Sequence, residues 1–261
     1  MIAAESAPTD VITYEYPFNE RIRTYLRLES LFRRLLELVA REEALDHHYA
    51  LASLFEVMEV GMRSDLRAEV LRDLEKQKQM LNGYRDKPGI AQAVLDEVLQ
   101  QLDESYGQLT SLTGKTGAML MENEWLMGIR SRINIPGGAC AFDLPAYFAW
   151  QNESAERRRA DLHRWISPLT PLAAAITLLL TLQRDSGVPQ KVLANGGQYQ
   201  QTLPQGRAFQ LLRLVIDPAL GLIPEISGNR LMLSIRLMRK DDNDRLHACT
   251  EDTSFELTLC A

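Results

Sequence analysis

Cys140 has the setting in this sequence that comes closest to that of a catalytic nucleophile. It follows Gly137-Gly138-Ala139, so that backbone N–H groups lie beside the thiol. Nucleophilic cysteine chemistry also needs a histidine as base. The four histidines are His47, His48, His163 and His247, and none stands in a recognisable partner motif. The sequence therefore favours a buried structural thiol, with a cysteine-dependent enzyme centred on Cys140 as the alternative function.

Two other patterns suggest a metal or a phosphate site, and both are incomplete. His247, Cys249 and Cys260 could ligate a metal from neighbouring strands, but structural zinc takes four ligands and no fourth is visible. Gly114-Lys115-Thr116 resembles the end of a phosphate-binding loop, but Leu109 stands where the pattern needs its first glycine. We therefore predict no metal site and no cofactor.

Three consecutive arginines, Arg157-Arg158-Arg159, form a basic run that could bind nucleic acid. Acidic residues lie close by on the same expected helix: Glu153, Glu156 and Asp161. Such a mixture is typical of a solvated face whose charges pair with one another. The net charge of -6 also repels nucleic acid at long range. The sequence predicts a self-paired surface here and no nucleic-acid partner.

The segment from Arg230 to Met238 alternates between apolar and exposed positions, as a half-buried strand does. The apolar set is Leu231, Leu233, Ile235 and Leu237, and the outward set is Arg230, Met232, Ser234, Arg236 and Met238. Arginines and exposed methionines on one flat face suit a peptide that carries carboxylates and apolar side chains. The alternative is an ordinary solvated face of a sheet.

The composition is that of an ordinary globular protein. The chain has 261 residues, 46% hydrophobic and 25% charged, which is enough for one large domain or two modest ones. The first ten residues lack the features of a signal peptide. The apolar run 171–182 is too short for a bilayer span of ~20 residues and predicts a buried core helix. Three cysteines without framework spacing suggest reduced thiols in the cytosol.

Hydrophobic periodicity predicts an α+β fold, with an N-terminal antiparallel α-helical domain and a C-terminal antiparallel β-rich domain. Asn19 is a plausible N-cap for the first helix. Further helices are expected from about residue 46 and over about 64–81, 90–112, 118–132, 154–166 and 171–184. Asn195-Gly196-Gly197 predicts a hairpin-type turn. The expected domains are a disordered tail over 1–10, a mainly helical domain over 11–187 and a β-rich domain over 188–261, and segments 11–16 and 134–150 are candidates to join the sheet.

Four stretches of the sequence match a known family. They are YPFNERIRTYLRLE (16–29), INIPGGACAFDLP (133–145), WISPLTPL (165–172) and PEISG (224–228), the last leading into IRLM (235–238). On these residues the chain resembles the ZapD family of Z-ring-associated proteins of bacterial cell division. The matches are spread over about residues 13 to 260, and the IPGG-C-FDLP stretch is the most specific of them.

The resemblance implies a homodimeric protein of two domains that works in the cytoplasm at the mid-cell division ring. It implies binding to the C-terminal tail of the tubulin-like division protein FtsZ and cross-linking of FtsZ filaments into bundles. Neither catalysis nor a cofactor is implied, and we expect no direct membrane insertion.

The resemblance also implies that basic residues contact the tail. Carried over by position, these are Arg236, Arg132, Arg63 and Arg27. Met232 occupies an outward position that is basic in relatives, and Arg230 lies near it. Together with the alternation described above, this predicts that the tail docks on the outward face of the strand at Arg230 and Arg236, helped by Arg132 and Arg213.

Overall fold

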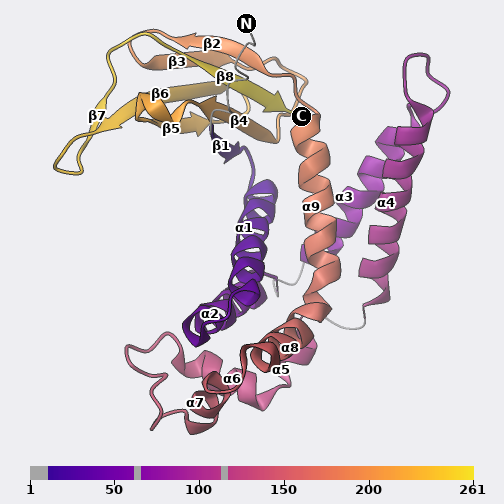
Figure 1. The fold of residues 1–261 in the computed structure, drawn as a ribbon. Helices are drawn as coiled ribbons and strands as arrows, with labels where there is room; N and C mark the ends of the chain where they lie inside the picture. Colours follow the sequence, from indigo (N-terminus) through magenta and orange to yellow (C-terminus); the bar gives the residue numbers. More distant parts are fainter. Residues whose placement is uncertain (1–10, 62–65, 113–116) are drawn as a thin grey trace, which may run out of the picture. The chain divides into compact units, whose positions relative to one another are not determined.

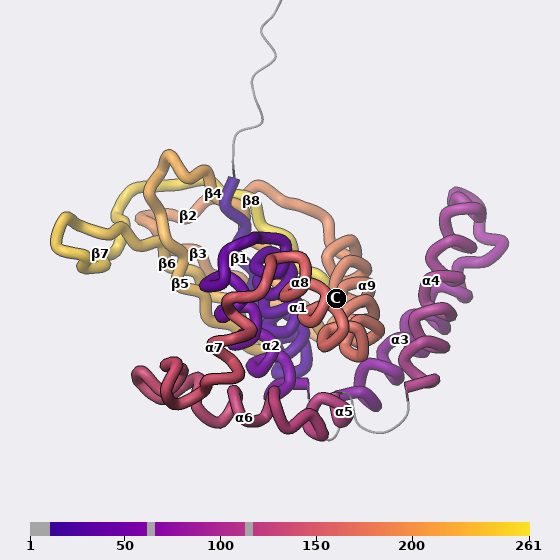
Figure 2. The backbone as a smooth tube through the Cα atoms, turned by 60° about the horizontal axis from the view of Figure 1, so that its bottom comes forward, coloured from indigo at the N-terminus to yellow at the C-terminus, as the bar shows by residue number. Residues whose placement is uncertain are grey.

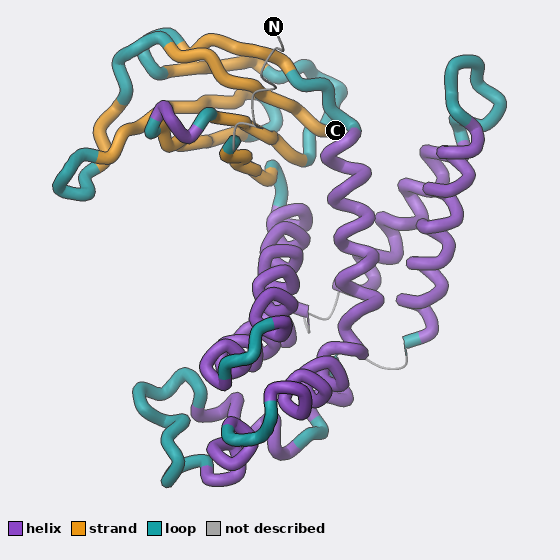
Figure 3. The backbone as a smooth tube through the Cα atoms, in the orientation of Figure 1, coloured by secondary structure: helices purple, strands orange, loops and turns teal. Residues whose placement is uncertain are grey.

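The computed structural model describes residues 11–61, 66–112 and 117–261. The expected tail, Arg63 and the Gly114-Lys115-Thr116 pattern lie outside these residues. The chain divides into two compact units. One combines the residues up to Arg23 with Thr181–Ala261, and the other spans Thr24–Leu180. The strands belong to the first unit, whereas the second is built from helices (Figure 3), so the predicted α+β class is confirmed.

The described residues form a succession of helices. They are α1 (Glu20–Ala40), α2 (Ala44–Gly61), α3 (Leu66–Asn82), α4 (Gln92–Ser111), α5 (Ala118–Met121), α6 (Glu124–Arg132), α7 (Pro145–Gln151), α8 (Ala155–Ile166) and α9 (Thr170–Asp185). Asn19 caps α1 as predicted, because its Oδ1 accepts a hydrogen bond from Ile22 N at 2.9 Å. Helices α3 and α4 pack side by side as an antiparallel hairpin (Figures 1 and 2).

The helix predicted over 118–132 is in fact two helices. Asn123 adopts an extended backbone between α5 and α6, and its Oδ1 accepts a hydrogen bond from Leu126 N at 3.1 Å. An asparagine side chain competes with the backbone for these bonds and favours a new helix start over continuation. The prediction of one helix was therefore wrong at Asn123.

Helices α8 and α9 are joined by a single 3-10 turn, Ser167–Leu169, into one helical stretch. This stretch, Ala155–Asp185, is long and apolar enough to cross a membrane by length and composition alone. In the structure α9 buries Leu172, Ile176 and Leu180 completely or almost completely. It therefore packs as the core helix that the sequence predicts.

The β-rich unit contains two antiparallel sheets. The strands are β1 (Ile12–Pro17), β2 (Gln190–Ala194), β3 (Gln198–Thr202), β4 (Leu211–Ile216), β5 (Leu222–Gly228), β6 (Met232–Lys240), β7 (Leu246–Ala248) and β8 (Thr253–Cys260). One sheet has the order β1-β4-β8-β2, and the other has the order β3-β6-β5 with β7 paired to β6 (Figure 1). Apolar side chains from β4, β6 and β8 form one buried cluster, which packs the two sheets face to face.

Of the two segments considered for the sheet, only the first joins it. β1 pairs with β4 along its whole length, from Ile12 opposite Ile216 to Pro17 opposite Leu211. Segment 134–150 instead forms turns followed by α7 and does not join the sheet. Gly138 N donates a hydrogen bond to Ile135 O at 2.8 Å, and Pro145 starts α7 at a position where a helix needs no N–H donor.

The predicted turn at Asn195-Gly196-Gly197 is confirmed, with a different role from the one expected. Both glycines have positive φ, 54° and 72°, and Gln198 N donates a hydrogen bond to Asn195 O at 3.0 Å. The strands on its two sides, β2 and β3, belong to different sheets. The turn therefore carries the chain from one layer of the sandwich to the other.

Candidate partner-binding site

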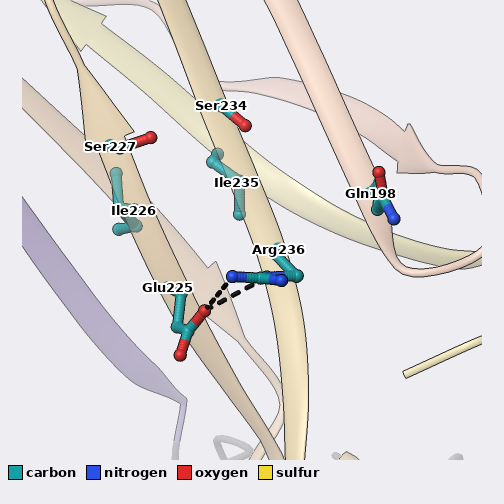
Figure 4. Close-up of a pocket in the computed structure, with 7 residues that line it drawn as sticks. All are labelled: Gln198, Glu225, Ile226, Ser227, Ser234, Ile235 and Arg236. Carbon is teal, nitrogen blue, oxygen red and sulfur yellow. Dashed lines mark hydrogen bonds and ion pairs between the residues drawn. The ribbon is translucent and has the colours of Figure 1, made fainter. Parts of the chain in front are cut away.

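Arg236 lies on the outer face of the sheet β3-β6-β5, as its alternation with Leu233, Ile235 and Leu237 predicts. Glu225 of β5 is its cross-strand neighbour. The guanidinium makes two contacts with Glu225 Oε2, at 2.9 Å from Nη2 and 3.1 Å from Nε (Figure 4). Both side chains are about half exposed, at 56% and 45%. This is a solvent-screened ion pair on a flat surface.

A depression of about 330 Å³ surrounds this pair. It is lined by Gln198, Glu225, Ile226, Ser227, Ser234, Ile235 and Arg236 (Figure 4). The lining offers one cation, one carboxylate and several neutral polar groups. A ligand carboxylate that binds the Nε and Nη2 side of Arg236 must displace Glu225.

The outer face carries fewer of the predicted residues than the alternation suggested. Strand β6 begins at Met232, so Arg230 and Leu231 precede it, and Leu231 is 60% exposed and not part of the core. Met238 is 8% exposed, because it lies between Ile223 of β5 and Ala248 of β7. The predictions for Leu231 and Met238 were therefore wrong. From the strand itself the outer face presents Met232, Ser234 and Arg236.

Three other predicted arginines lie elsewhere, each with a carboxylate nearby. Arg213 is on the outer face of the other sheet, 3.4 Å from Glu15, so it does not share a face with Arg236. In the helical unit, Arg132 pairs with Asp143 at 3.1 Å. Arg27 is exposed beside a depression of about 400 Å³ that two glutamates also line, Glu56 and Glu59.

Arg230 has different surroundings from the other nominated arginines. It lines a groove of about 770 Å³ together with Phe18, Arg207 and Leu231. Sequence reasoning missed Arg207, because it stands in the irregular segment between β3 and β4, where no periodicity marks a face. A signal was present in the chain, since Pro204 and Gly206 mark a loop that brings a basic residue next to Phe209.

Among the described residues, no recorded hydrogen bond joins the Cys140 thiol to a histidine. This thiol is exposed, so the prediction of a buried thiol was wrong. His47 contacts Arg158 and Arg41, His48 contacts Tyr147, and His247 contacts Asp241. Within the described residues, none of these histidine contacts involves a cysteine. The described part of the chain also holds no group of three or more His, Cys, Asp or Glu side chains placed to share a metal ion.

The run Arg157-Arg158-Arg159 is only partly the self-paired surface that was predicted. Arg157 pairs with Glu153 at 3.2 Å, and Arg159 lies 3.9 Å from Glu42. Arg158 instead points inward and is 6% exposed. The prediction was wrong for Arg158, because a helix turns by about 100° per residue and the middle residue of the run faces the interior.

Comparison with known proteins identifies the family of this chain. The family model described as "ZapD: Cell division protein" matches residues 26–236. A protein named "Cell division protein ZapD" from Janthinobacterium sp. (strain Marseille) is 51% identical over 96% of this chain and 100% of its own length. A protein of the same name from Ralstonia pickettii (strain 12J) is 51% identical over 96% of this chain and 99% of its own length. The chain belongs to the ZapD family of cell division proteins.

Proposed function

We propose that this cell division protein is an adaptor that binds the C-terminal tail of FtsZ and cross-links FtsZ filaments into bundles at the cytoplasmic division ring. Membership of the ZapD family supports a role in cell division. The observation that carries the finer proposal is the outer face of β6, where Arg236 is exposed and is paired only with the half-exposed Glu225. An acidic tail segment can replace such a partner at little cost.

Cross-linking requires two tail sites in one particle, and we propose that a symmetric homodimer supplies them. The helical unit exposes large apolar side chains, among them Phe142 at 84% and Leu45 at 65%, which leaves apolar surface for a contact between copies. A monomer with one tail site decorates a filament without joining two. Light scattering at micromolar concentration is expected to show a dimer, and a monomer that still bundles filaments would contradict this part of the proposal.

Co-sedimentation with FtsZ polymer tests the proposed partner. The protein is expected to pellet with polymer of full-length FtsZ and to remain in the supernatant with polymer that lacks the C-terminal tail. Electron microscopy of the same samples should show bundles only with the full-length polymer. Equal pelleting with both polymers would place the contact outside the tail, and no pelleting with either would refute the proposed function.

A further inference from the structure

A groove in the β-rich unit is lined by basic and apolar side chains. It lies where β1 passes into α1 and is bounded by the segment 203–210 and by the turn that precedes β6. Its volume is about 770 Å³. Its lining includes Phe18, Arg207, Phe209, Arg230 and Leu231. We call this feature the Arg207 groove.

The charge of the Arg207 groove has one sign. Arg21, Arg207 and Arg230 line it, and no aspartate or glutamate is among the described residues of its lining. This differs from the positions of Arg236, Arg213, Arg132 and Arg27, each of which has a carboxylate close by. Arg207 and Arg230, in a described lining that holds no aspartate or glutamate, concentrate positive potential at one place on a chain of net charge -6.

Arg207 is held against the apolar part of the groove. Its guanidinium carbon lies 5.2 Å from the centre of the Phe209 ring, a cation–π contact. This contact orients the side chain without using up its hydrogen-bond donors. The guanidinium therefore remains able to form the two parallel N–H···O bonds that arginine makes with a carboxylate.

Leu231 supplies an exposed apolar contact on a fixed backbone. Its side chain is 60% exposed. Its N–H donates to Asn229 Oδ1 at 2.8 Å, and its carbonyl accepts a hydrogen bond from Leu203 N at 2.8 Å. Because both backbone groups are already bonded, a ligand that packs on Leu231 does not have to order the chain first, which reduces the entropy cost of binding.

We propose that the Arg207 groove binds a peptide segment of a partner protein in which a large apolar side chain is flanked by carboxylates. The carboxylates pair with Arg207 and Arg230, and the apolar side chain packs against Leu231 and Phe18. The proposal rests on the proposed function for the identity of the partner, but not for the chemistry of the groove. It adds a second peptide contact in the β-rich unit to the one proposed at Arg236.

A peptide fits the groove better than nucleic acid does. Single-stranded nucleic acid binds where bases stack on open aromatic rings along a basic track. Here the ring of Phe209 is covered by the guanidinium of Arg207, and the most exposed apolar side chain is aliphatic, that of Leu231. Leucine offers contact area to an aliphatic or aromatic side chain but no stacking platform to a base.

Fluorescence anisotropy with a designed probe tests the groove. The probe is a labelled peptide of about eight residues with two central leucines flanked by aspartates, titrated with the full-length protein. Two control peptides replace the leucines with serines or the aspartates with lysines. We expect saturable binding of the probe, at least about tenfold weaker binding of the serine peptide and none of the lysine peptide.

Variants of the full-length protein locate the binding. Arg207→Glu and Leu231→Asp should each weaken binding of the probe at least about tenfold. Arg239→Glu is the matched control, since Arg239 is an exposed, ion-paired arginine of β6 outside the groove lining, and it should change binding less than about twofold. Circular dichroism verifies that each variant is folded. If Arg207→Glu fails to fold, the milder Arg207→Gln replaces it as the test variant.

Three outcomes would overturn the proposal. They are unchanged binding of the probe by both folded groove variants, equal binding of the lysine peptide, or tighter binding of a single-stranded oligonucleotide that displaces the probe. Co-sedimentation separates this failure from failure of the proposed function. If FtsZ pelleting depends on the tail but the probe never binds, the groove proposal fails and the proposed function stands. If the probe binds and the protein does not pellet with FtsZ, the proposed function fails and the groove proposal stands.

Discussion

Two arginines, one in each unit, show how differently the same side chain is used. Arg158 in the helical unit is 6% exposed and donates to His47 Nδ1 at 2.9 Å and to the carbonyls of Gln151, Glu153 and Glu42. Arg236 in the β-rich unit is 56% exposed and contacts one half-exposed carboxylate. Arg158 satisfies buried His47 and part-buried backbone carbonyls and so stabilises the fold, whereas the partner of Arg236 can be exchanged for a ligand.

The largest effect that tests this comparison is expected from Arg158→Ala. Removal of the guanidinium leaves His47 Nδ1 and three part-buried carbonyls without this donor, at roughly 1–3 kcal/mol for each group left unsatisfied. We therefore expect the free energy of unfolding to fall by about 3 kcal/mol or more. Tryptophan fluorescence during urea denaturation reports the unfolding of the helical unit, because Trp125, Trp150 and Trp165 all belong to this unit.

Arg157→Ala is the matched control for this experiment. Arg157 is the preceding residue of α8, and its side chain is 75% exposed in a pair with Glu153. Its loss should cost less than about 1 kcal/mol. Similar losses for the two variants would show that Arg158 does not stabilise the helical unit and would remove the contrast with Arg236.

The next effect is on binding, with stability unchanged. Arg236→Ala should weaken the affinity for the FtsZ tail peptide by roughly 1–3 kcal/mol. Arg236→Glu should weaken it more, because the new carboxylate lies beside Glu225 and repels an acidic ligand. Titration calorimetry of the tail peptide measures both, and higher salt should reduce the affinity of the wild type.

Arg239→Glu controls for the change of net charge, since Arg239 is on the same strand and pairs with Glu251 at 3.0 Å. Equal affinities of the wild type and a folded Arg236→Glu variant for the tail peptide would show that the tail does not bind at Arg236. The Arg207 groove would then be the leading location, and Arg27 in the helical unit the next.

Arg158 and Arg236 also show which features of the fold and of the candidate site the sequence predicts. Strict alternation around Leu233, Ile235 and Leu237 was enough to place Arg236 on an outer face, because side chains on a strand point alternately to its two sides. The helical periodicity of 154–166 likewise predicted α8, but the composition of the arginine run suggested solvent for all three members. The burial of Arg158 depends on long-range contacts with His47 and Glu42, 111 and 116 residues away in the chain.

The Arg207 groove could not be predicted for a similar reason. Phe18, Arg207 and Leu231 come from three segments far apart in the sequence, and two of these segments have no repeating pattern. Their meeting depends on the pairing of β1 with β4 and on the loops at the edge of the sandwich. Local propensity and patterning fix the elements, whereas a groove between loops depends on tertiary packing.

Burial of His47, the partner of Arg158, makes the stability of the helical unit dependent on pH. Burial lowers the pKa of His47 below its usual 6.5, and the charges of Arg158 and Arg159 act in the same direction, although the carbonyl of Arg41 opposes them. His47 Nδ1 accepts a hydrogen bond from Arg158, and Nε2 lies 3.0 Å from Arg41 O. Protonation of Nδ1 would place its new N–H donor next to the Nε–H donor of Arg158. Folding therefore favours the neutral ring.

The sign of the effect follows from proton binding. Below pH 6.5 the unfolded chain protonates His47 more readily than the folded chain does. The stabilisation is therefore complete above pH 6.5 and is lost as the pH falls through the lower pKa of the folded state. Urea midpoints of tryptophan fluorescence at about pH 7.5 and about pH 5.5 should show this loss, and His47→Gln should reduce the difference between them.

His48 adds a change of the same sign, because burial lowers its pKa too, so His47→Gln should leave part of the pH dependence. The control His163→Gln alters an exposed histidine of α8 and should leave the dependence as it is. A difference between the two midpoints that His47→Gln does not reduce would exclude His47 as the titrating group.

The smallest effect is expected from Cys140→Ala. Like Arg236, Cys140 is exposed. It contributes to the turn through its backbone, whose carbonyl accepts hydrogen bonds from Asp143 N and Leu144 N at 3.0 Å each. Alanine keeps both bonds, so the turn should persist and the free energy of unfolding should change by less than about 0.5 kcal/mol. Bundling of FtsZ filaments, followed by light scattering, should be unchanged. Complete loss of bundling by a folded Cys140→Ala variant would instead support thiol chemistry at this turn, the alternative that the sequence left open.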